Sequence, residues 1–135
     1  MPMTDLALVS VLVIDDQELA QRAVMAVLGK IGVTRIAVAE NGAEAIERLK
    51  AAETKIDLII CDIDMPEMTG WEFIREIRDG TVDNRKDIPI LMLTGLDTDY
   101  GMTGEQYRID GFITKPATAD RLRAHMVRVL GASPG

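Results

Sequence analysis

The sequence predicts an α/β fold in which helices cover both faces of a parallel β-sheet. Five short apolar runs alternate along the chain with segments whose apolar residues recur at helical spacing. The apolar runs are almost continuous, which is typical of parallel strands buried on both faces of a sheet. The chain has 135 residues, of which 47% are hydrophobic and 27% charged. We therefore expect a single globular domain over residues 1–135, with its core at about 8–130 and a short tail at each end.

The elements follow one another in strict alternation. Aliphatic runs predict strands at 8–14, 36–39, 58–61, 90–93 and 111–114. Helical spacing of apolar residues predicts helices at 18–31, 43–51, 71–78, 100–109 and from 118 or 119 to 130. Gly32 is expected to stop the first helix, and Asn41 to cap the second. The fourth helix is weak, because Gly101 and Gly104 each cost about 1 kcal/mol relative to alanine.

Composition excludes several classes of function. The net charge of -7, with no run of lysine or arginine, predicts no direct binding to nucleic acid. The lone Cys61 cannot form an internal disulfide, and its apolar neighbours predict a place in the core. The first 15 residues contain no basic leader, and Ser10 interrupts an apolar run too short to span a bilayer. We expect a cytoplasmic protein with no membrane contact.

Polar and charged residues stand where the predicted strands end. Asp15 and Asp16 follow the first strand, Asp62 the third, Thr94 the fourth and Lys115 the fifth. Open parallel sheets bind ligands beyond the carboxyl ends of their strands. If the first and third strands are neighbours, three carboxylates share one space, where two of them about 4 Å apart repel by roughly 4 kcal/mol at an effective dielectric constant of about 20. Protonation or a hard divalent cation such as Mg²⁺ would relieve this repulsion.

Four motifs at these strand ends resemble the receiver domain of two-component response regulators, the CheY-like family. They are VLVIDD, LIICDIDMPEMTGWE, ILMLTG and GFITKP, and the resemblance covers essentially the whole chain. It implies a doubly wound five-stranded parallel sheet of strand order 2-1-3-4-5 with five helices. It also implies a signalling domain rather than an enzyme, acting alone or within a phosphorelay.

The resemblance assigns a role to each site residue. Asp62 would accept a phosphoryl group from the phosphohistidine of a sensor histidine kinase or a phosphotransfer protein. Mg²⁺ would be held by the side chains of Asp16 and Asp62, by Asp15 mainly through water, and by the backbone carbonyl of Asp64. Thr94 and Lys115 would contact the phosphoryl oxygens.

The resemblance also implies a route for output. Phe112 lies at the position of an aromatic switch residue, which would move inward as Thr94 shifts towards the phosphate. A downstream protein would bind the face formed by the fourth helix, the fifth strand and the fifth helix. Pro116 follows Lys115, and receivers often carry a cis peptide at this bond. Asp64 and Leu96 are expected to flank the mouth of the site, where Asp64 would modulate hydrolysis of the phosphoryl bond.

Single residues leave other interpretations open. Asp15 and Asp16 are also suited to an N-cap and a first-turn acid of the following helix. Phe112 is also suited to plain core packing. His125, the only histidine, is conceivable as a phosphorelay residue on the last helix.

Rival functions also remain. A phosphatase of the haloacid dehalogenase type uses two aspartates spaced like Asp62 and Asp64. Those enzymes, however, keep the pair on their first strand and need a threonine where Pro66 stands. An inactive receiver used only for docking, and a receiver cut from a longer kinase or transcription factor, are the further alternatives.

Overall fold

The computed structural model describes residues 5–51, 55–63, 70–95 and 108–131. Its strands are β1 (Ser10–Ile14), β2 (Arg35–Ala39), β3 (Leu58–Asp62), β4 (Ile90–Thr94) and β5 (Gly111–Thr114). Its helices are the 3-10 helix η1 (Leu6–Leu8) and the α-helices α1 (Glu18–Lys30), α2 (Gly42–Ala51), α3 (Gly70–Arg78) and α5 (Ala119–Leu130). The element order therefore follows the predicted alternation of strands and helices.

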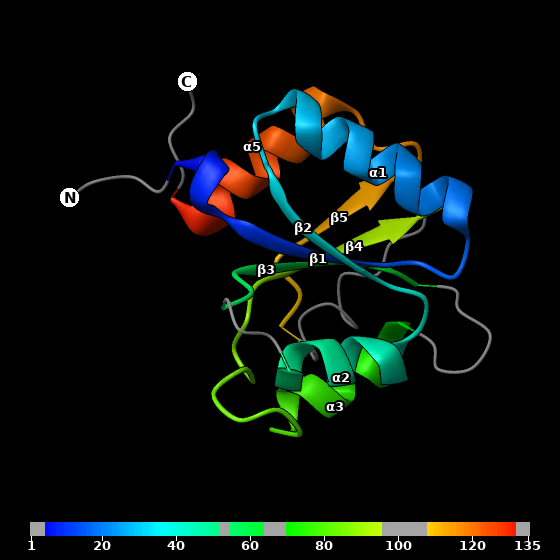
Figure 1. The fold of residues 1–135 in the computed structure, drawn as a ribbon, viewed down its shortest axis with the longest axis vertical. Coiled ribbons are helices and arrows are strands. Elements are labelled where there is room, and N and C mark those ends of the chain that lie inside the picture. Colours follow the sequence, from blue (N-terminus) through cyan, green and yellow to red (C-terminus); the bar gives the residue numbers. More distant parts are fainter. Residues whose placement is uncertain (1–4, 52–54, 64–69, 96–107, 132–135) are drawn as a thin grey trace.

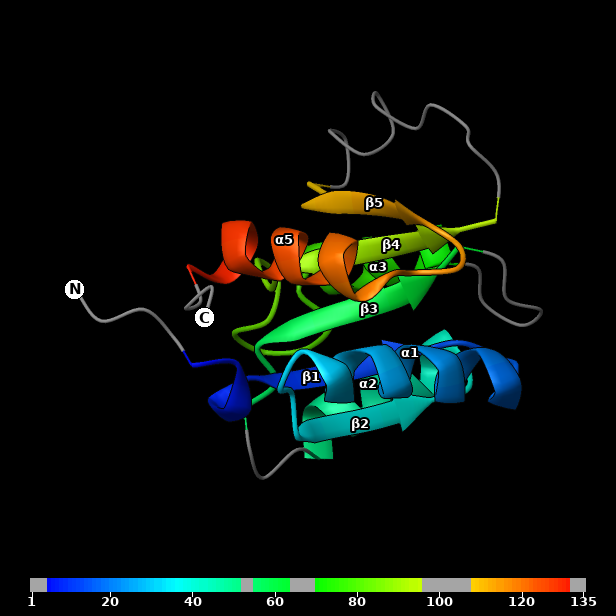
Figure 2. The ribbon, with the colours of Figure 1, turned by 90° about the horizontal axis from the view of Figure 1, so that it is seen from above.

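The five strands form one parallel sheet in the order β2-β1-β3-β4-β5. This confirms the predicted strand order (Figure 2). Helices α1 and α5 cover one face of the sheet, and α2 and α3 cover the other (Figure 1). Because all strands run the same way, their carboxyl ends lie together at one end of the sheet, which we call the carboxyl edge. The opposite end, where the strands begin, is the amino edge.

Each face of the sheet has its own apolar core. Alternate residues of β1 and β3 enter opposite layers, so that Leu12 and Ile59 lie under α2 and α3 while Val13 and Ile60 lie under α1 and α5. Every residue of β1, β3 and β4 is buried. Burial on both faces explains why these strands are almost continuously apolar in the sequence.

Two boundaries differ from the prediction. The first strand begins at Ser10 rather than Leu8, because residues 6–8 form a 3-10 turn whose N-cap, Asp5, accepts a 2.9 Å hydrogen bond from the Ala7 amide. Four α-helices are present among the described residues, whereas five were predicted. Most of the predicted helix at 100–109 lies outside the described residues, and Arg108 and Ile109 are not helical.

The predicted helix caps are confirmed. The Asn41 side chain accepts a 2.8 Å hydrogen bond from the Glu44 amide at the start of α2. Thr118 caps α5 in the same way, with a 3.3 Å bond from the Arg121 amide. Gly32 follows α1 at a φ of 99°, a left-handed conformation that glycine adopts without steric cost.

Candidate functional site

The carboxyl edge of the sheet carries a cluster of three aspartates. Carboxylate oxygens of Asp15, Asp16 and Asp62 all lie within 4.8 Å of one another. Asp15 directly follows β1 and Asp62 ends the neighbouring strand β3, so the parallel register brings them to the same point. Asp15 and Asp62 are buried, whereas Asp16 is exposed. The structure thus brings together the three acids that the sequence predicted to share one space.

Short hydrogen bonds fix the position of Asp15. Its Oδ1 accepts a 3.0 Å bond from the Gln17 amide, and its backbone carbonyl accepts a 2.6 Å bond from the Gln21 side chain. The residue at the N-cap of α1 is Gln17, which makes no side-chain cap bond. The N-cap alternative for Asp15 and Asp16 is therefore wrong, and the role of Gln21 in holding Asp15 was not apparent from the sequence.

Lys115 brings a positive charge to the cluster from β5. Its Nζ lies 3.1 Å from Asp62 Oδ1 and 3.5 Å from Asp15 Oδ2. Burial alone would lower the pKa of the Lys115 ammonium, but the hydrogen bond to Asp62 and the charges of Asp62 and Asp15 outweigh it and raise this pKa. The side chain therefore stays protonated and positioned for an additional anionic oxygen.

The donor set of the cluster fits a hard divalent cation. All three groups offer carboxylate oxygens, which Mg²⁺ prefers as ligands, and one of the three is open to solvent. A single ammonium offsets only part of the charge of three carboxylates. The residues present therefore suit Mg²⁺, with Asp15, Asp16 and Asp62 as the side chains that would hold it.

Thr94 and Phe112 lie on the neighbouring strands β4 and β5, on the same side of the sheet. Thr94 ends β4, its side chain is buried, and its carbonyl accepts a 2.7 Å hydrogen bond from the Lys115 amide. Phe112 pairs in register with Met92, two residues before Thr94, so Phe112 and Thr94 face the same side of the sheet. Phe112 is half-buried, and its ring centroid lies 6.2 Å from that of Trp71 on α3.

Gly70 controls how closely α3 approaches the acidic cluster. A Cβ atom at this position would lie 2.5 Å from the backbone oxygen of Asp62 and 3.0 Å from the Ile63 Cα atom. The Gly70 amide also donates a 2.8 Å hydrogen bond to the Ile63 carbonyl. The sequence pattern indicated only that Gly70 leads into a helix, because a close approach of two backbones leaves no periodic signal.

Cys61 precedes Asp62 but takes no part in the site. It is fully buried, and burial, reinforced by the charges of Asp62 and Asp15, raises the pKa of its thiol far above the usual value. The predicted core position is confirmed, and the thiol has no access to the reactive thiolate form.

Two predicted site residues, Asp64 and Leu96, lie outside the described residues. The peptide bond between Lys115 and Pro116 is cis, as the resemblance implied. Beside the acidic cluster, an apolar hollow of about 550 Å³ is bounded by Asp15, Lys115, Pro116 and the alanine-rich side of α1.

Comparison with known proteins identifies the class of this module. A sequence profile described as the response regulator receiver domain matches residues 11–127, and the chain belongs to this family. Receiver domains are signalling switches of two-component systems, and CheY-like receivers interact with histidine kinases and downstream targets.

Individual relatives agree with this assignment. The chain is 36% identical over 128 residues to chemotaxis protein CheY1 of Helicobacter pylori, covering 90% of this chain and 97% of that protein. It superposes with a TM-score of 0.78 on the structure of chemotaxis protein CheY4 of Vibrio cholerae, at 32% identity, covering 90% of this chain and 98% of that chain. It is also 38% identical over 109 residues to a protein-glutamate methylesterase/protein-glutamine glutaminase of Archaeoglobus fulgidus, covering 78% of this chain but only 29% of that protein.

Across the part of the chain that the structure describes, no helix is both long enough and apolar enough to cross a bilayer.

Proposed function

We propose that the chain accepts a phosphoryl group on Asp62 in a Mg²⁺-dependent reaction. The observation that carries this proposal is the pairing of Lys115 with Asp62 at 3.1 Å inside a cluster of three carboxylates. A buried carboxylate with a lysine on one side and a cation site on the other is suited to attack phosphorus while flanking positive charges stabilise the transferring group.

In the proposed reaction, an oxygen of Asp62 forms a bond to phosphorus as the bond from phosphorus to a histidine nitrogen of the donor breaks. The nitrogen keeps the electron pair of the broken bond. Lys115 pairs with one phosphoryl oxygen, and the Thr94 hydroxyl donates a hydrogen bond to another. The side chains of Asp15, Asp16 and Asp62 would hold Mg²⁺, Asp15 mainly through water, and the backbone carbonyl of Asp64 would be a further ligand. When bound, Mg²⁺ neutralises negative charge on the phosphoryl oxygens.

The donor is a sensor histidine kinase or a phosphotransfer protein. Two features beside the site suit an approaching protein surface. Leu19, on the first turn of α1, is 81% exposed, and the apolar hollow next to Lys115 is shaped by the small side chains Ala20 and Ala23. The phosphoryl group stays on Asp62, and movements of Thr94 and Phe112 carry the change to the face that includes β5 and α5.

The test is incubation of the protein with Mg²⁺ and acetyl phosphate, followed by intact-mass measurement. The wild type should gain the mass of one phosphoryl group, and Asp62→Asn should gain none. Asp79→Asn, an exposed aspartate at the end of α3, is the matched control and should react like the wild type. Phosphorylation of Asp62→Asn, or a reaction unaffected by chelating the Mg²⁺, would contradict the proposal.

The same preparation separates the receiver from a phosphatase of similar acid spacing. A receiver should take up one phosphoryl group on Asp62 and should not turn over phosphate monoesters such as p-nitrophenyl phosphate. Asp64→Asn should change the rate at which phosphorylated Asp62 is hydrolysed. Catalytic turnover of the monoester would favour the enzyme.

A further inference from the structure

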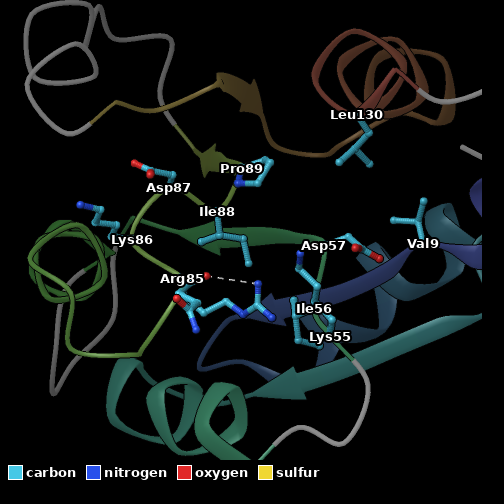
Figure 3. Close-up of a pocket in the computed structure, with 11 residues that line it drawn as sticks. Val9, Lys55, Ile56, Asp57, Arg85, Lys86, Asp87, Ile88, Pro89 and Leu130 are labelled. Atoms are coloured by element: carbon cyan, nitrogen blue, oxygen red, sulfur yellow. Dashed lines mark hydrogen bonds between the residues drawn. The ribbon is translucent and has the colours of Figure 1, made fainter. Parts of the chain in front are cut away.

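The amino edge of the sheet, opposite the acidic cluster, contains a cavity of about 590 Å³. It opens between the segments that lead into β1, β3 and β4 and the end of α5 (Figure 3). This volume falls within the range of small-molecule binding sites in proteins. None of the residues assigned to phosphoryl transfer lines this cavity.

Much of the wall of the cavity is aliphatic. It is built by Val9, Ile56, Ile88, Pro89 and Leu130. Val9, Ile56 and Ile88 are buried parts of the two core layers or their margins, so their positions are fixed by packing. The wall therefore presents a preformed apolar surface rather than one that must reorganise when a ligand binds.

Three cationic residues, Lys55, Arg85 and Lys86, line the cavity, and Arg85 projects into it from the loop before β4. In Figure 3 its guanidinium lies in the middle of the hollow, below Ile88 and beside Ile56. Its guanidinium donates a 3.4 Å hydrogen bond to the Asn84 carbonyl. No carboxylate of the described residues lies within ion-pair distance of it. The guanidinium is half-buried, and one long hydrogen bond leaves most of its N–H donors available for an anion.

The two acids of the cavity are already engaged elsewhere. Asp57 accepts a 2.9 Å hydrogen bond from the Ser10 amide and turns its carboxylate towards Val9 in Figure 3. Asp87 points away from the hollow and pairs with Arg108 at 2.6 Å. Neither carboxylate neutralises Arg85, so the centre of the cavity is positive although the protein as a whole carries a net charge of -7.

The loop that carries Arg85 is firmly attached to the domain. Arg78 on α3 donates 2.7 Å hydrogen bonds to the carbonyls of both Lys86 and Ile88. The Pro89 carbonyl accepts a 3.0 Å bond from the Ile59 amide in β3. These bonds hold the backbone of the loop that carries Arg85 against the rest of the domain.

We propose that this amino-edge cavity binds a small organic anion that carries an apolar group. Arg85 pairs with the anionic head, and the aliphatic wall covers the apolar part. Lys86 lines the rim but points away from the hollow in Figure 3, so it attracts anions at long range without contacting the ligand. The site is separate from the acidic cluster and operates whether or not Asp62 is phosphorylated.

The test is titration of the isotope-labelled full chain, without Mg²⁺, with naphthalene-2-sulfonate, followed by amide NMR shifts. We expect saturable shifts in residues 55–57 and 84–88. The Arg85→Gln variant should bind about tenfold more weakly or worse, the loss that one charge-assisted hydrogen bond accounts for. The neutral naphthalene-2-methanol and inorganic sulfate should each bind at least about tenfold more weakly than the sulfonate, because each lacks one half of the recognition.

Two further variants serve as controls, and the NMR spectrum reports whether each is folded. Lys30→Gln, at the end of α1 and outside the cavity, should bind like the wild type. Lys86→Gln should weaken binding by about twofold at most, as expected for a screened surface charge. An equal loss in Lys86→Gln and Arg85→Gln would indicate diffuse attraction and overturn the proposed site.

Other outcomes also contradict the proposal. These are shifts confined to other residues, equal binding of the neutral alcohol, and unchanged affinity in Arg85→Gln. An acidic, leucine-containing peptide that shifts the same amides and binds at least about tenfold more tightly than the sulfonate would assign the cavity to a partner protein instead of a small molecule.

Discussion

Gly70 illustrates how a single residue without a side chain positions the candidate phosphoacceptor. Its α-carbon lies so close to β3 that an added Cβ would meet the Asp62 backbone oxygen at 2.5 Å. This neighbour is backbone rather than the end of a side chain, and Met92 closes the space at 3.0 Å. Neither side can move without displacing Asp62 or the start of α3.

We therefore predict that Gly70→Ala destabilises the protein by about 1–3 kcal/mol through overpacking. It should also slow phosphorylation of Asp62 by acetyl phosphate about tenfold, because small displacements of a nucleophile are costly. Urea unfolding and intact mass measure the two effects.

Gly29→Ala is the matched control for this substitution. A Cβ at Gly29 meets nothing within 4 Å, and the residue lies inside α1. This variant should gain up to about 1 kcal/mol of stability and keep wild-type phosphorylation. Equal stability of the two variants would show that the close contact at Gly70 is relieved without cost.

His125 is held in its neutral form by the packing of α5 on β5. Its Nδ1 lies 2.8 Å from Arg128 Nη2, and the same guanidinium donates a 2.6 Å bond to the Asp110 carbonyl. Burial first, and then the charge of Arg128, lower the pKa of His125 from its ordinary value of 6.5. This structural role accounts for the histidine without a part in phosphotransfer.

The lowered pKa predicts a specific pH dependence. Between about pH 6.5 and the lower pKa of the folded state, His125 is protonated in the unfolded chain but mostly neutral in the folded chain. The free energy of unfolding therefore falls as the pH drops across this window. His125→Gln should lack this component. Urea unfolding of both proteins at about pH 7.5 and about pH 5.5 should show the wild type losing stability relative to the variant at the lower pH. An identical difference at both values would refute this role of His125.

The sequence predicted that the acids and Lys115 meet, because the carboxyl ends of neighbouring parallel strands lie close together. It did not predict the contacts that hold them. The bond from Gln21 to Asp15 and the close approach at Gly70 depend on where α1 and α3 sit against the sheet. Single-sequence periodicity carries no such tertiary information.

Among the elements, α3 is joined to two distant segments by Arg78. Its guanidinium donates to the carbonyls of Lys86 and Ile88 at 2.7 Å and to that of Arg108 at 2.8 Å. The side chain is only 7% exposed, and Asp110 lies 3.9 Å away. Arg78 thus fixes both the loop that leads into β4 and the segment that leads into β5.

Replacing Arg78 with alanine should destabilise the protein by about 2–4 kcal/mol, because three carbonyls lose a charged donor and part of the network is buried. Arg78→Lys keeps the charge but not the fork of donors, so its loss should be intermediate. Urea unfolding measures both variants.

Arg22→Ala provides the comparison for Arg78. Arg22 pairs with Glu18 at 2.6 Å, but both side chains are 72% exposed. Loss of such a surface pair should change stability by no more than about 0.5 kcal/mol. If Arg78→Ala cost no more than Arg22→Ala, the proposed tie between α3 and the two segments would be wrong.

The sequence predicted the type and order of the described strands and α-helices, because buried parallel strands and amphipathic helices have different periods. The predicted start of the first strand was less accurate, because a local helix cap competes there with strand propensity. Leu8 and Val9 are apolar like the strand that follows, but Asp5 caps a 3-10 turn that delays β1 to Ser10.

On the scale of the whole molecule, the sheet separates two kinds of charge. Its carboxyl edge presents the cluster of Asp15, Asp16 and Asp62, and its amino edge presents the cavity with Arg85. The two apolar layers cover the two faces of the sheet between these ends. In the proposed function, a signal that begins at the acidic edge would reach β5 through Thr94 and Phe112, which face the same side of the sheet.

The route can be followed through Trp71, the only tryptophan in the chain. Its ring lies 6.2 Å from Phe112, centroid to centroid, so movement of Phe112 changes its surroundings. Addition of Mg²⁺ and beryllofluoride, a phosphoryl mimic, should alter Trp71 emission in the wild type. Asp62→Asn should show no change, and Phe112→Leu a smaller one. Wild-type emission that stays constant when the mimic is bound would count against movement of Phe112.

We propose that residues at the carboxyl ends of β1, β3 and β5 together form one magnesium-dependent phosphoryl site. A crystal structure of the protein with Mg²⁺ and beryllofluoride tests it most directly. We expect beryllofluoride on the Asp62 carboxylate, Lys115 against one of its fluorines, and the ion among Asp15, Asp16 and Asp62. Beryllofluoride bound elsewhere, or an ion held without Asp62, would disprove the proposed site.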